Sequence, residues 1–338
     1  MSNNKKMLKL NKPMIYCHTV IGAMSSIAEE KDLGWIFSNF TQIMYNDDWR
    51  EFIFDDQNRL LETCPFIQMN SVMFEKSEFN SQLFIDRITY MIDNDCYAFL
   101  FLDRKILSIN DSHFAHTTLI SGYDKDKKVF YLNDNYDQGR FITIEMDMET
   151  TAEAFRSAWT YTSADENYCD RSEVYPFLRN VSMLKYNTNV SISMDIDNFY
   201  RQLKCFINAE SIFLFCDRKK AHFGFNVYQL IIDILHERCD FPLETKDFHV
   251  LYEHKLVMKK RIEYMISSGF LPSDKGYLEI SDRICDEFMA IRNLYLKSMI
   301  GEAKSKNNII EKICERLRDS QKIEIKFYNN LISEYNKS

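Results

Sequence analysis

The sequence is poor in residues that break regular structure, with 8 glycines and 5 prolines among 338 residues. No segment matches a phosphate-binding P-loop or a dinucleotide-binding fingerprint, both of which depend on clustered glycines. The chain also lacks a long apolar run. Its longest strongly apolar stretch is CYAFLFL, residues 96–102, which is far too short to span a bilayer. These absences argue against ATP-driven ligation and against a membrane-spanning protein.

The chain also lacks an excess of positive charge: 50 acidic residues outnumber 42 basic ones, and the net charge is −8. Binding to a nucleic-acid backbone requires concentrated positive charge. The nine cysteines include no C-x-x-C pair and are odd in number, which indicates reduced thiols rather than a disulfide framework or a zinc ribbon. The N-terminal segment MSNNKKMLKLNKPM lacks the apolar core of a secretory signal. We therefore expect a cytoplasmic protein that does not bind nucleic acid.

Helical and strand-like segments are separated along the chain. Helical spacing begins at Cys17 and ends in Gly34. From residue 96 strand-like segments follow: CYAFLFLD, HTTLISGYD, KVFYLND, RFITIEMD and residues 181–186. The polar stretch at 187–198 is the predicted boundary, and the helical periodicity beyond it indicates a bundle of about four to six helices. We therefore predict an α+β domain at residues 1–188 and a helical domain at residues 189–338.

A β-hairpin is predicted where two apolar segments flank the turn sequence DKDKK, residues 124–128. With the turn centred on Lys125, His116 faces Asp134, and opposed antiparallel residues have Cβ atoms about 4.5–5.5 Å apart. A carboxylate at that distance would fix the imidazole tautomer and stabilise the imidazolium. The same register places His113 opposite Asp137, so an outer pair is an alternative. A solvent-facing histidine beside a turn aspartate is the purely structural interpretation.

Cys17 differs from the other cysteines by its position. It directly follows the extended segment KPMIY and begins the first predicted helix. A helix N-terminus favours negative charge, lowers the pKa of a thiol and offers backbone N–H groups to an oxyanion. The cysteines within the C-terminal helical segments are explained by packing. Cys17 is therefore the candidate nucleophile.

Together, Cys17, HTTLISGYD and VFYLND resemble the papain-like fold of bacteriocin-leader cysteine peptidases. There, a nucleophilic cysteine opens the first helix, and H-x5-G-Y-D and an apolar strand ending in N-D follow later. The two-domain plan resembles more closely the butirosin-H-like acyltransferases and related amide-forming cysteine-peptidase homologues of thiotemplated pathways, including closthioamide assembly. The motif resemblance covers residues 10–186. It implies Cys17 as nucleophile, His116 as general base and acid, and Asp134 as the residue that orients the imidazole.

The chain departs from the peptidase pattern at three positions. His18 follows the nucleophile where those peptidases usually have glycine, and Asn135 replaces the proline common after the aspartate. The peptidases carry an oxyanion-stabilising glutamine six residues before the cysteine, and Asn11 occupies that position here. A carboxamide of this kind can donate the same hydrogen bond. Asn11 is therefore a candidate oxyanion residue, together with the backbone N–H of Cys17.

Two further polar motifs have bearing on ligands. HFAH, residues 113–116, has an H-x-x-H spacing but lacks the helix face that binds zinc in H-E-x-x-H, so no metal site is predicted. The run DRKKAHFGFN, residues 217–226, is the best local positive patch. In the acyltransferase relatives a loop of this kind lies near the active site. Arg218, Lys219 and Lys220 are therefore candidates for docking an acidic carrier protein or its phosphopantetheine phosphate, with a solvated turn as the alternative.

The resemblance implies a papain-like catalytic domain at residues 1–188 and a cysteine acyltransferase activity. Cys17 would take an acyl group from a carrier-protein thioester, and an amine deprotonated by His116 would then form an amide in natural-product (antibiotic) biosynthesis. No cofactor is expected, because the acyl or peptidyl carrier protein brings the substrate on its phosphopantetheine. The expected partners are that carrier and a small amine, without membrane, and a homodimer is compatible with the sequence. A peptidase or amidase of the same fold and a non-catalytic carrier-binding scaffold are the alternatives.

Overall fold

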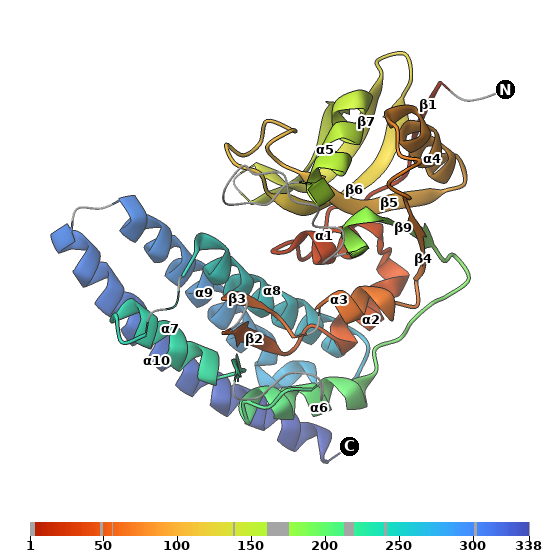
Figure 1. Cartoon of the computed structure of the whole chain (residues 1–338). Coiled ribbons are helices and arrows are strands. Elements are labelled where there is room, and N and C mark those ends of the chain that lie inside the picture. Colours follow the sequence, from red (N-terminus) through yellow and green to blue (C-terminus); the bar gives the residue numbers. More distant parts are fainter. Residues whose placement is uncertain are drawn as a thin grey trace. The chain divides into compact units, whose positions relative to one another are not determined.

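The computed structural model describes residues 4–47, 50–55, 57–137, 139–160, 176–212, 220–239, 241, 243–300 and 303–337. The chain forms two compact units (Figure 1). Unit 1 comprises Met1–Glu30 and Asn58–Ser191, and unit 2 comprises Lys31–Gln57 and Ile192–Ser338. The protein is mixed α+β, as predicted. Within the described ranges, no helix combines the length and apolar composition needed to cross a bilayer.

Unit 1 is built on one antiparallel sheet. Its strands are β1 (Lys5–Met7), β4 (Ile67–Met73), β5 (Cys96–Asp103), β6 (Ala115–Asp124), β7 (Val129–Asp137), β8 (Arg140–Asp147) and β9 (Asn180–Tyr186). Its helices are α1 (Thr19–Ile27), α3 (Gln57–Glu62), α4 (Ser81–Asp93) and α5 (Met148–Thr160). The strand order is β4-β9-β5-β6-β7-β8, and β1 pairs with the part of β6 that β5 leaves open. The strands predicted from residue 96 onward are confirmed.

The two faces of this sheet carry different helices. Helices α4 and α5 pack on one face (Figure 1), and Phe84, Phe155, Phe130 and Leu132 belong to the core between them and the strands. Helix α1 lies against the other face, where a Cβ at Gly22 would lie 2.6 Å from the ring of Phe141 on β8. Alternation along the strands separates these faces. The middle of α1, at Gly22, therefore lies on the sheet face opposite the main aromatic core.

The predicted register of the β6–β7 hairpin was wrong by three residues next to the turn and by two residues beyond Gly122. The structure pairs Leu119 with Asn133, whereas a turn centred on Lys125 would pair Leu119 with Tyr131. The ladder also shifts between Ile120 and Gly122. At Gly122 a Cβ would lie 2.5 Å from the backbone oxygen of Lys6 on β1, so only glycine admits the added strand. The register depends on this long-range strand as well as on the turn.

The first helix is shorter than predicted. It begins at Thr19, two residues after Cys17, and ends at Ile27, and Gly34 lies inside a separate helix. Asn11 explains where α1 ends: its backbone N–H donates to Ser26 O at 2.7 Å, and its carboxamide donates to Ala28 O at 2.8 Å. Because the lead-in segment takes these carbonyls, the chain leaves the helical path there.

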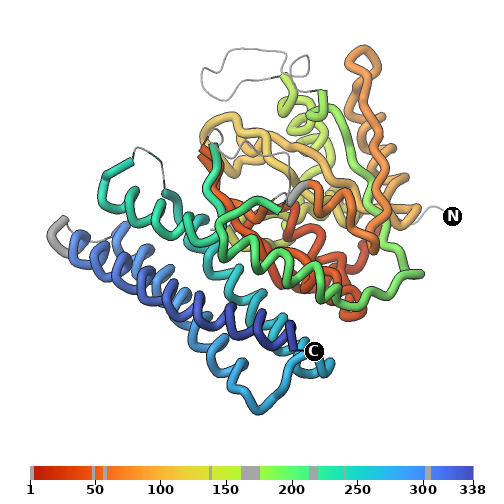
Figure 2. Tube along the Cα trace, turned by 90° about the horizontal axis from the view of Figure 1, so that it is seen from below, coloured from red at the N-terminus to blue at the C-terminus, as the bar shows by residue number. Residues whose placement is uncertain are grey.

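Unit 2 contains the helices predicted from the C-terminal half together with a small sheet. Its helices are α2 (Leu33–Ser38), α6 (Ile196–Ile207), α7 (Asn226–Leu235), α8 (Thr245–Ser267), α9 (Tyr277–Ile300) and α10 (Ala303–Tyr335). Its strands, in the order β10-β2-β3, are β2 (Ile43–Asn46), β3 (Glu51–Phe54) and β10 (Ala221–Phe223). Helices α8, α9 and α10 run side by side (Figure 2).

The domain boundary predicted after residue 188 lies close to the observed crossing at Ser191, but residues 31–57 were assigned to the wrong part of the chain. They belong to unit 2 because β2 pairs with β10, β3 packs on α8, and α2 packs on α6 and α8. All of these contacts join residues more than 140 positions apart. Local periodicity carries no information about such pairing.

A buried ion pair lies in the core of unit 2. Lys255 Nζ is 2.6 Å from Glu324 Oε2, and both side chains are fully buried. The hydroxyls of Tyr228 and Tyr328 donate to the same carboxylate at 3.0 and 2.8 Å. The ammonium also lies 4.8 Å from the ring centroid of Phe288. These partners satisfy charges that would otherwise be costly to bury.

A second buried carboxyl in unit 2 lies at the start of α8. Asp247 is 3% exposed, and its Oδ2 accepts the backbone N–H of Glu244 at 2.7 Å. Burial raises the pKa of Asp247 to about 7, while the Glu244 N–H and the charge of Lys246 oppose that rise. The folded protein therefore holds this proton more tightly than the unfolded chain does. The contribution of Asp247 to the free energy of unfolding falls as the pH rises from about 4 to about 7.

Asp247→Asn keeps an acceptor for the Glu244 N–H and removes the buried charge. We expect its free energy of unfolding to equal that of the wild type near pH 4 and to exceed it by about 2–3 kcal/mol at pH 8. This value allows for the positive end of α8, which favours an anion by about 1 kcal/mol. Urea denaturation at a series of pH values measures the difference. A difference that does not grow with pH would contradict the assignment.

Candidate active site

The carboxylate of Asp134 on β7 is fully buried and joins three segments of unit 1. Its Oδ2 lies 3.0 Å from His116 Nδ1 on β6 and accepts from Arg104 Nη2, after β5, at 2.7 Å. Its Oδ1 accepts from the hydroxyl of Thr19 at the start of α1 and from the backbone N–H of Asn135 at 2.6 Å. The predicted His116–Asp134 contact is therefore present, although the register differs, because side chains also reach their diagonal neighbours.

The surroundings of Asp134 favour its ionised form. Burial by itself would raise its pKa, but the hydrogen bond and charge of His116, together with the charge of Arg104, hold the pKa below its usual value. The Thr19 hydroxyl acts in the same direction. A carboxylate that remains ionised beside an imidazole can orient the ring and stabilise its cation.

Cys17 is tied to the same strand through its neighbours. The backbone oxygen of Tyr16 accepts from Asn135 Nδ2 at 2.7 Å, and the hydroxyl of Thr19 donates to Asp134. Cys17 forms no disulfide and is 6% exposed. These tethers hold the chain on both sides of Cys17 over the part of β7 that also positions His116. The first-turn N–H groups of α1 follow directly after Cys17, and such groups have no partner inside a helix.

The outer pair considered from the sequence does not match the structure. His113 Nδ1 lies 2.5 Å from Asp103 Oδ2, which also accepts from Ser157 Oγ at 2.6 Å. Burial would raise the pKa of Asp103, but these donors and two backbone N–H groups lower it below its usual value. His113 and His116 thus contact different aspartates. In the ranges that the structure describes, no group of three or more His, Cys, Asp or Glu side chains is arranged to hold a metal ion.

The predicted oxyanion role of Asn11 was wrong. Its carboxamide donates to Ala28 O and its backbone N–H donates to Ser26 O. Both acceptors lie at the C-terminal end of α1, whereas Cys17 precedes the N-terminal end. A nine-residue helix is about 13 Å long, so Asn11 cannot donate to an oxyanion at Cys17.

Of the basic residues predicted to dock a carrier protein, Arg218 and Lys219 lie outside the described residues. Lys220 is exposed in unit 2 and precedes β10. Its backbone oxygen accepts the N–H of Asp47 at 2.9 Å. The docking role of this run stays a prediction.

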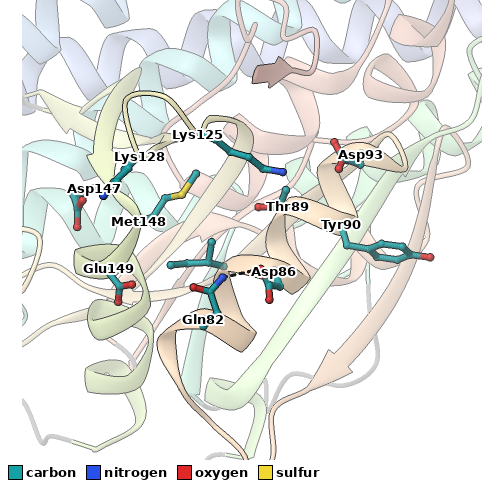
Figure 3. A pocket seen from close by; sticks show the side chains of 11 residues that line it. Gln82, Asp86, Thr89, Tyr90, Asp93, Lys125, Lys128, Asp147, Met148 and Glu149 are labelled. Atoms are coloured by element: carbon teal, nitrogen blue, oxygen red, sulfur yellow. Dashed lines mark hydrogen bonds between the residues drawn. The ribbon is translucent and has the colours of Figure 1, made fainter. Parts of the chain in front are cut away.

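A surface cavity of about 600 Å³ in unit 1 lies apart from the candidate site (Figure 3). It is bounded by α4, the β6–β7 turn and the start of α5, with Lys125, Lys128 and Asp147 among its lining residues. The turn is at one end of β6, and His116 is at the other end. The cavity therefore lies away from His116 and the candidate site.

Three residues of the site were not predicted as participants. Arg104 directly follows the strand CYAFLFLD, Thr19 is in the first turn of α1, and Asn135 follows Asp134. Thr19 and Asn135 sit next to residues that were singled out, so their positions gave a local signal. Arg104 gave none, because its contact with Asp134 depends on the path of the loop between β5 and β6.

No family model matches this chain, and no curated protein gives a match.

The two histidines provide a matched test of the site. His116→Ala should slow alkylation of Cys17 by iodoacetamide at pH 7 by about ten-fold or more, because no imidazole remains to accept the thiol proton. His113→Ala should leave that rate within about two-fold and lower the free energy of unfolding by about 1–3 kcal/mol through loss of its bond to Asp103. Peptide mass spectrometry and urea denaturation measure the two quantities. Reversed effects would assign the site to the His113–Asp103 pair.

Proposed function

We propose that this chain is a cytoplasmic cysteine acyltransferase of papain-like fold that forms an amide from a carrier-protein thioester. The observation that carries the proposal is the carboxylate of Asp134, which contacts the imidazole of His116 and holds Thr19, two residues after Cys17. A nucleophile, a base and an orienting group are the parts that covalent acyl transfer requires. The role in natural-product biosynthesis follows from the sequence resemblance.

In the first half-reaction, His116 accepts the thiol proton of Cys17 and the sulfur attacks the acyl thioester. The tetrahedral intermediate collapses, the carrier's phosphopantetheine thiolate leaves, and it takes the proton from His116. Backbone N–H groups at Cys17 and in the first turn of α1 would stabilise the oxyanion. In the second half-reaction, an amine attacks the acyl-Cys17 thioester while His116 removes its proton. The amide forms and Cys17 leaves as a thiol reprotonated by His116.

This chemistry needs no cofactor of the chain's own. Exchange between two thioesters is nearly isoenergetic, and aminolysis of a thioester is downhill, so the activated acyl group supplies the driving force. The acyl or peptidyl carrier protein would bring that group on its phosphopantetheine. Lys220 is the described member of the basic run that would contact the acidic carrier.

Intact-mass spectrometry after incubation with acyl-loaded carrier proteins tests the nucleophile. We expect wild-type protein to gain the mass of the acyl group and to lose it when an amine is added, with an amide as product. Cys17→Ala should gain no mass and remain folded, because the change removes one buried sulfur atom and retains the Cβ. Cys285→Ala, at a buried helical cysteine, is the control and should still be acylated.

Other outcomes of this incubation identify the alternatives. Release of free acid at the same rate with and without amines would indicate a peptidase or amidase. Carrier binding without any adduct would indicate a scaffold, and an adduct on a different cysteine would remove Cys17 from the mechanism.

Asp134→Asn should reduce the rate of acyl transfer by about 10²–10⁴ and leave the chain folded. An amide can still accept from one imidazole nitrogen, but it provides no charge to stabilise the imidazolium. The loss should not add to that of His116→Ala, since both changes disable one unit. Asp103→Asn is the matched control, because it makes the same change at the other buried histidine–aspartate pair. Equal losses of transfer in the two variants would show that Asp134 has no special role.

A further inference from the structure

Arg104 occupies a position that a cysteine–histidine–aspartate site does not require. Its Nη2 donates to Asp134 Oδ2 at 2.7 Å and lies 3.0 Å from His116 Nδ1, and the oxygen and the imidazole nitrogen are themselves 3.0 Å apart. The three atoms form a nearly equilateral triangle. A guanidinium is a permanent cation and only donates hydrogen bonds. Arg104 and the imidazole therefore both interact with the same carboxylate oxygen of Asp134.

The side chain of Arg104 is held in this position. Its guanidinium carbon is 6.0 Å from the ring centroid of Phe114 and 5.9 Å from that of Tyr136, and the side chain is 14% exposed. Its backbone N–H donates to Phe114 O at 2.9 Å, and its backbone oxygen accepts from Ile109 N at 2.9 Å. These contacts close the loop between β5 and β6 at its base and leave the guanidinium few other positions.

The adjacent carboxylate of Asp103 keeps the same loop closed. It accepts the backbone N–H groups of Lys105 and Phe114 at 3.1 and 3.0 Å, and it also contacts His113 and Ser157. Residues on both sides of Arg104 are therefore fixed by one buried group. The Arg104–Asp134 contact is built into the fold and does not depend on a mobile surface side chain.

We propose that Arg104 is a positioning residue that opposes a second proton on His116, so that Cys17 and His116 rest as a neutral thiol–imidazole pair. This inference rests on the proposed function. The guanidinium and the carboxylate are both 3.0 Å from Nδ1, so Arg104 opposes the imidazolium on the same scale as Asp134 favours it. Because Arg104 offsets the charge of Asp134, transfer of the thiol proton to the imidazole is less favourable before substrate binds.

The described charged and titratable side chains around His116 come from each neighbouring element. Asp134 on β7 and Arg104 in the loop after β5 contact Nδ1, and Tyr136 on β7 lies beside Arg104. His113 and Asp103 belong to the same loop and to the end of β5, and the chain that bears Cys17 and His18 precedes α1, whose Thr19 donates to Asp134. Burial and the charge of Asp134 raise the pKa of Tyr136, so it remains neutral. His113 and Asp103 contact each other. Among the residues that the structure describes, Arg104 is the permanently charged side chain that contacts Nδ1 of His116.

A neutral resting pair suits a thioester substrate. An acyl thioester is already activated, so a thiol that loses its proton during attack is sufficient. An unactivated amide demands a stronger nucleophile, as a preformed thiolate provides. A resting thiol also reacts more slowly with oxidants and adventitious electrophiles. A neutral resting pair is therefore sufficient for an activated acyl group.

The pH profile of Cys17 alkylation tests this inference without any acyl substrate. Arg104→Gln removes the charge and retains an N–H donor for Asp134. We expect the midpoint of the profile to fall by about one pH unit, so that alkylation near pH 5.5 becomes about ten-fold faster. Arg104→Lys retains the charge and should match the wild type. Arg104→Met, which fills the space between the two rings, repeats the neutral variant if the glutamine chain fails to fold.

The outcomes separate the inference from the proposed function. An unchanged or raised midpoint in both neutral variants would overturn the role of Arg104, even if wild-type protein transfers acyl groups. The proposed function fails instead if wild-type protein gains no acyl group at Cys17 from an acyl-loaded carrier protein, whatever the pH profile of alkylation. Burial raises the pKa of the partly exposed thiols of Cys96 and Cys239, so their alkylation rates provide an internal reference within the same protein.

Discussion

The burial of one carboxylate, that of Asp134, is the constraint on which the architecture around the candidate site depends. A carboxylate removed from water must be surrounded by donors. Those donors come from α1, from β6 and from the loop after β5, through Thr19, His116 and Arg104. Satisfying the charge therefore requires that these elements meet at one place. Stability of the sheet end and geometry of the site follow from the same contacts.

The two histidine–aspartate pairs of unit 1 show why such a contact is not sufficient evidence of chemistry. Asp103 and Asp134 are both buried, and each contacts an imidazole through Nδ1. The other donors to Asp103 are Ser157 and backbone groups that close a loop. Asp134 instead connects to the chain on the C-terminal side of an unoxidised cysteine. The two pairs therefore differ in the second group that each carboxylate contacts: Asp134 contacts Thr19, close to Cys17, and Asp103 contacts Ser157 and loop backbone.

The strands from residue 96 onward and the long C-terminal helices were predictable, because their periodicity is local to each segment. The His116–Asp134 contact was also predictable despite a wrong register, since side chains tolerate a diagonal offset. The part of the site contributed by Arg104 was not predictable, nor was the actual role of Asn11. Both depend on where loops and lead-in segments travel. The placement of residues 31–57 failed for the same reason, as β2 finds its partner β10 far along the chain.

The passage of residues 31–57 through unit 2 has a consequence for synthesis on the ribosome. This segment emerges early, yet its strand partner β10 and its helical neighbours α6 and α8 emerge more than 140 residues later. At about 5–20 residues per second, that interval lasts at least several seconds. During it, the apolar strands IMYN and EFIF lack their native cover. These two strands are therefore exposed to aggregation while the ribosome synthesises the rest of unit 1, whose sequence lies on both sides of residues 31–57.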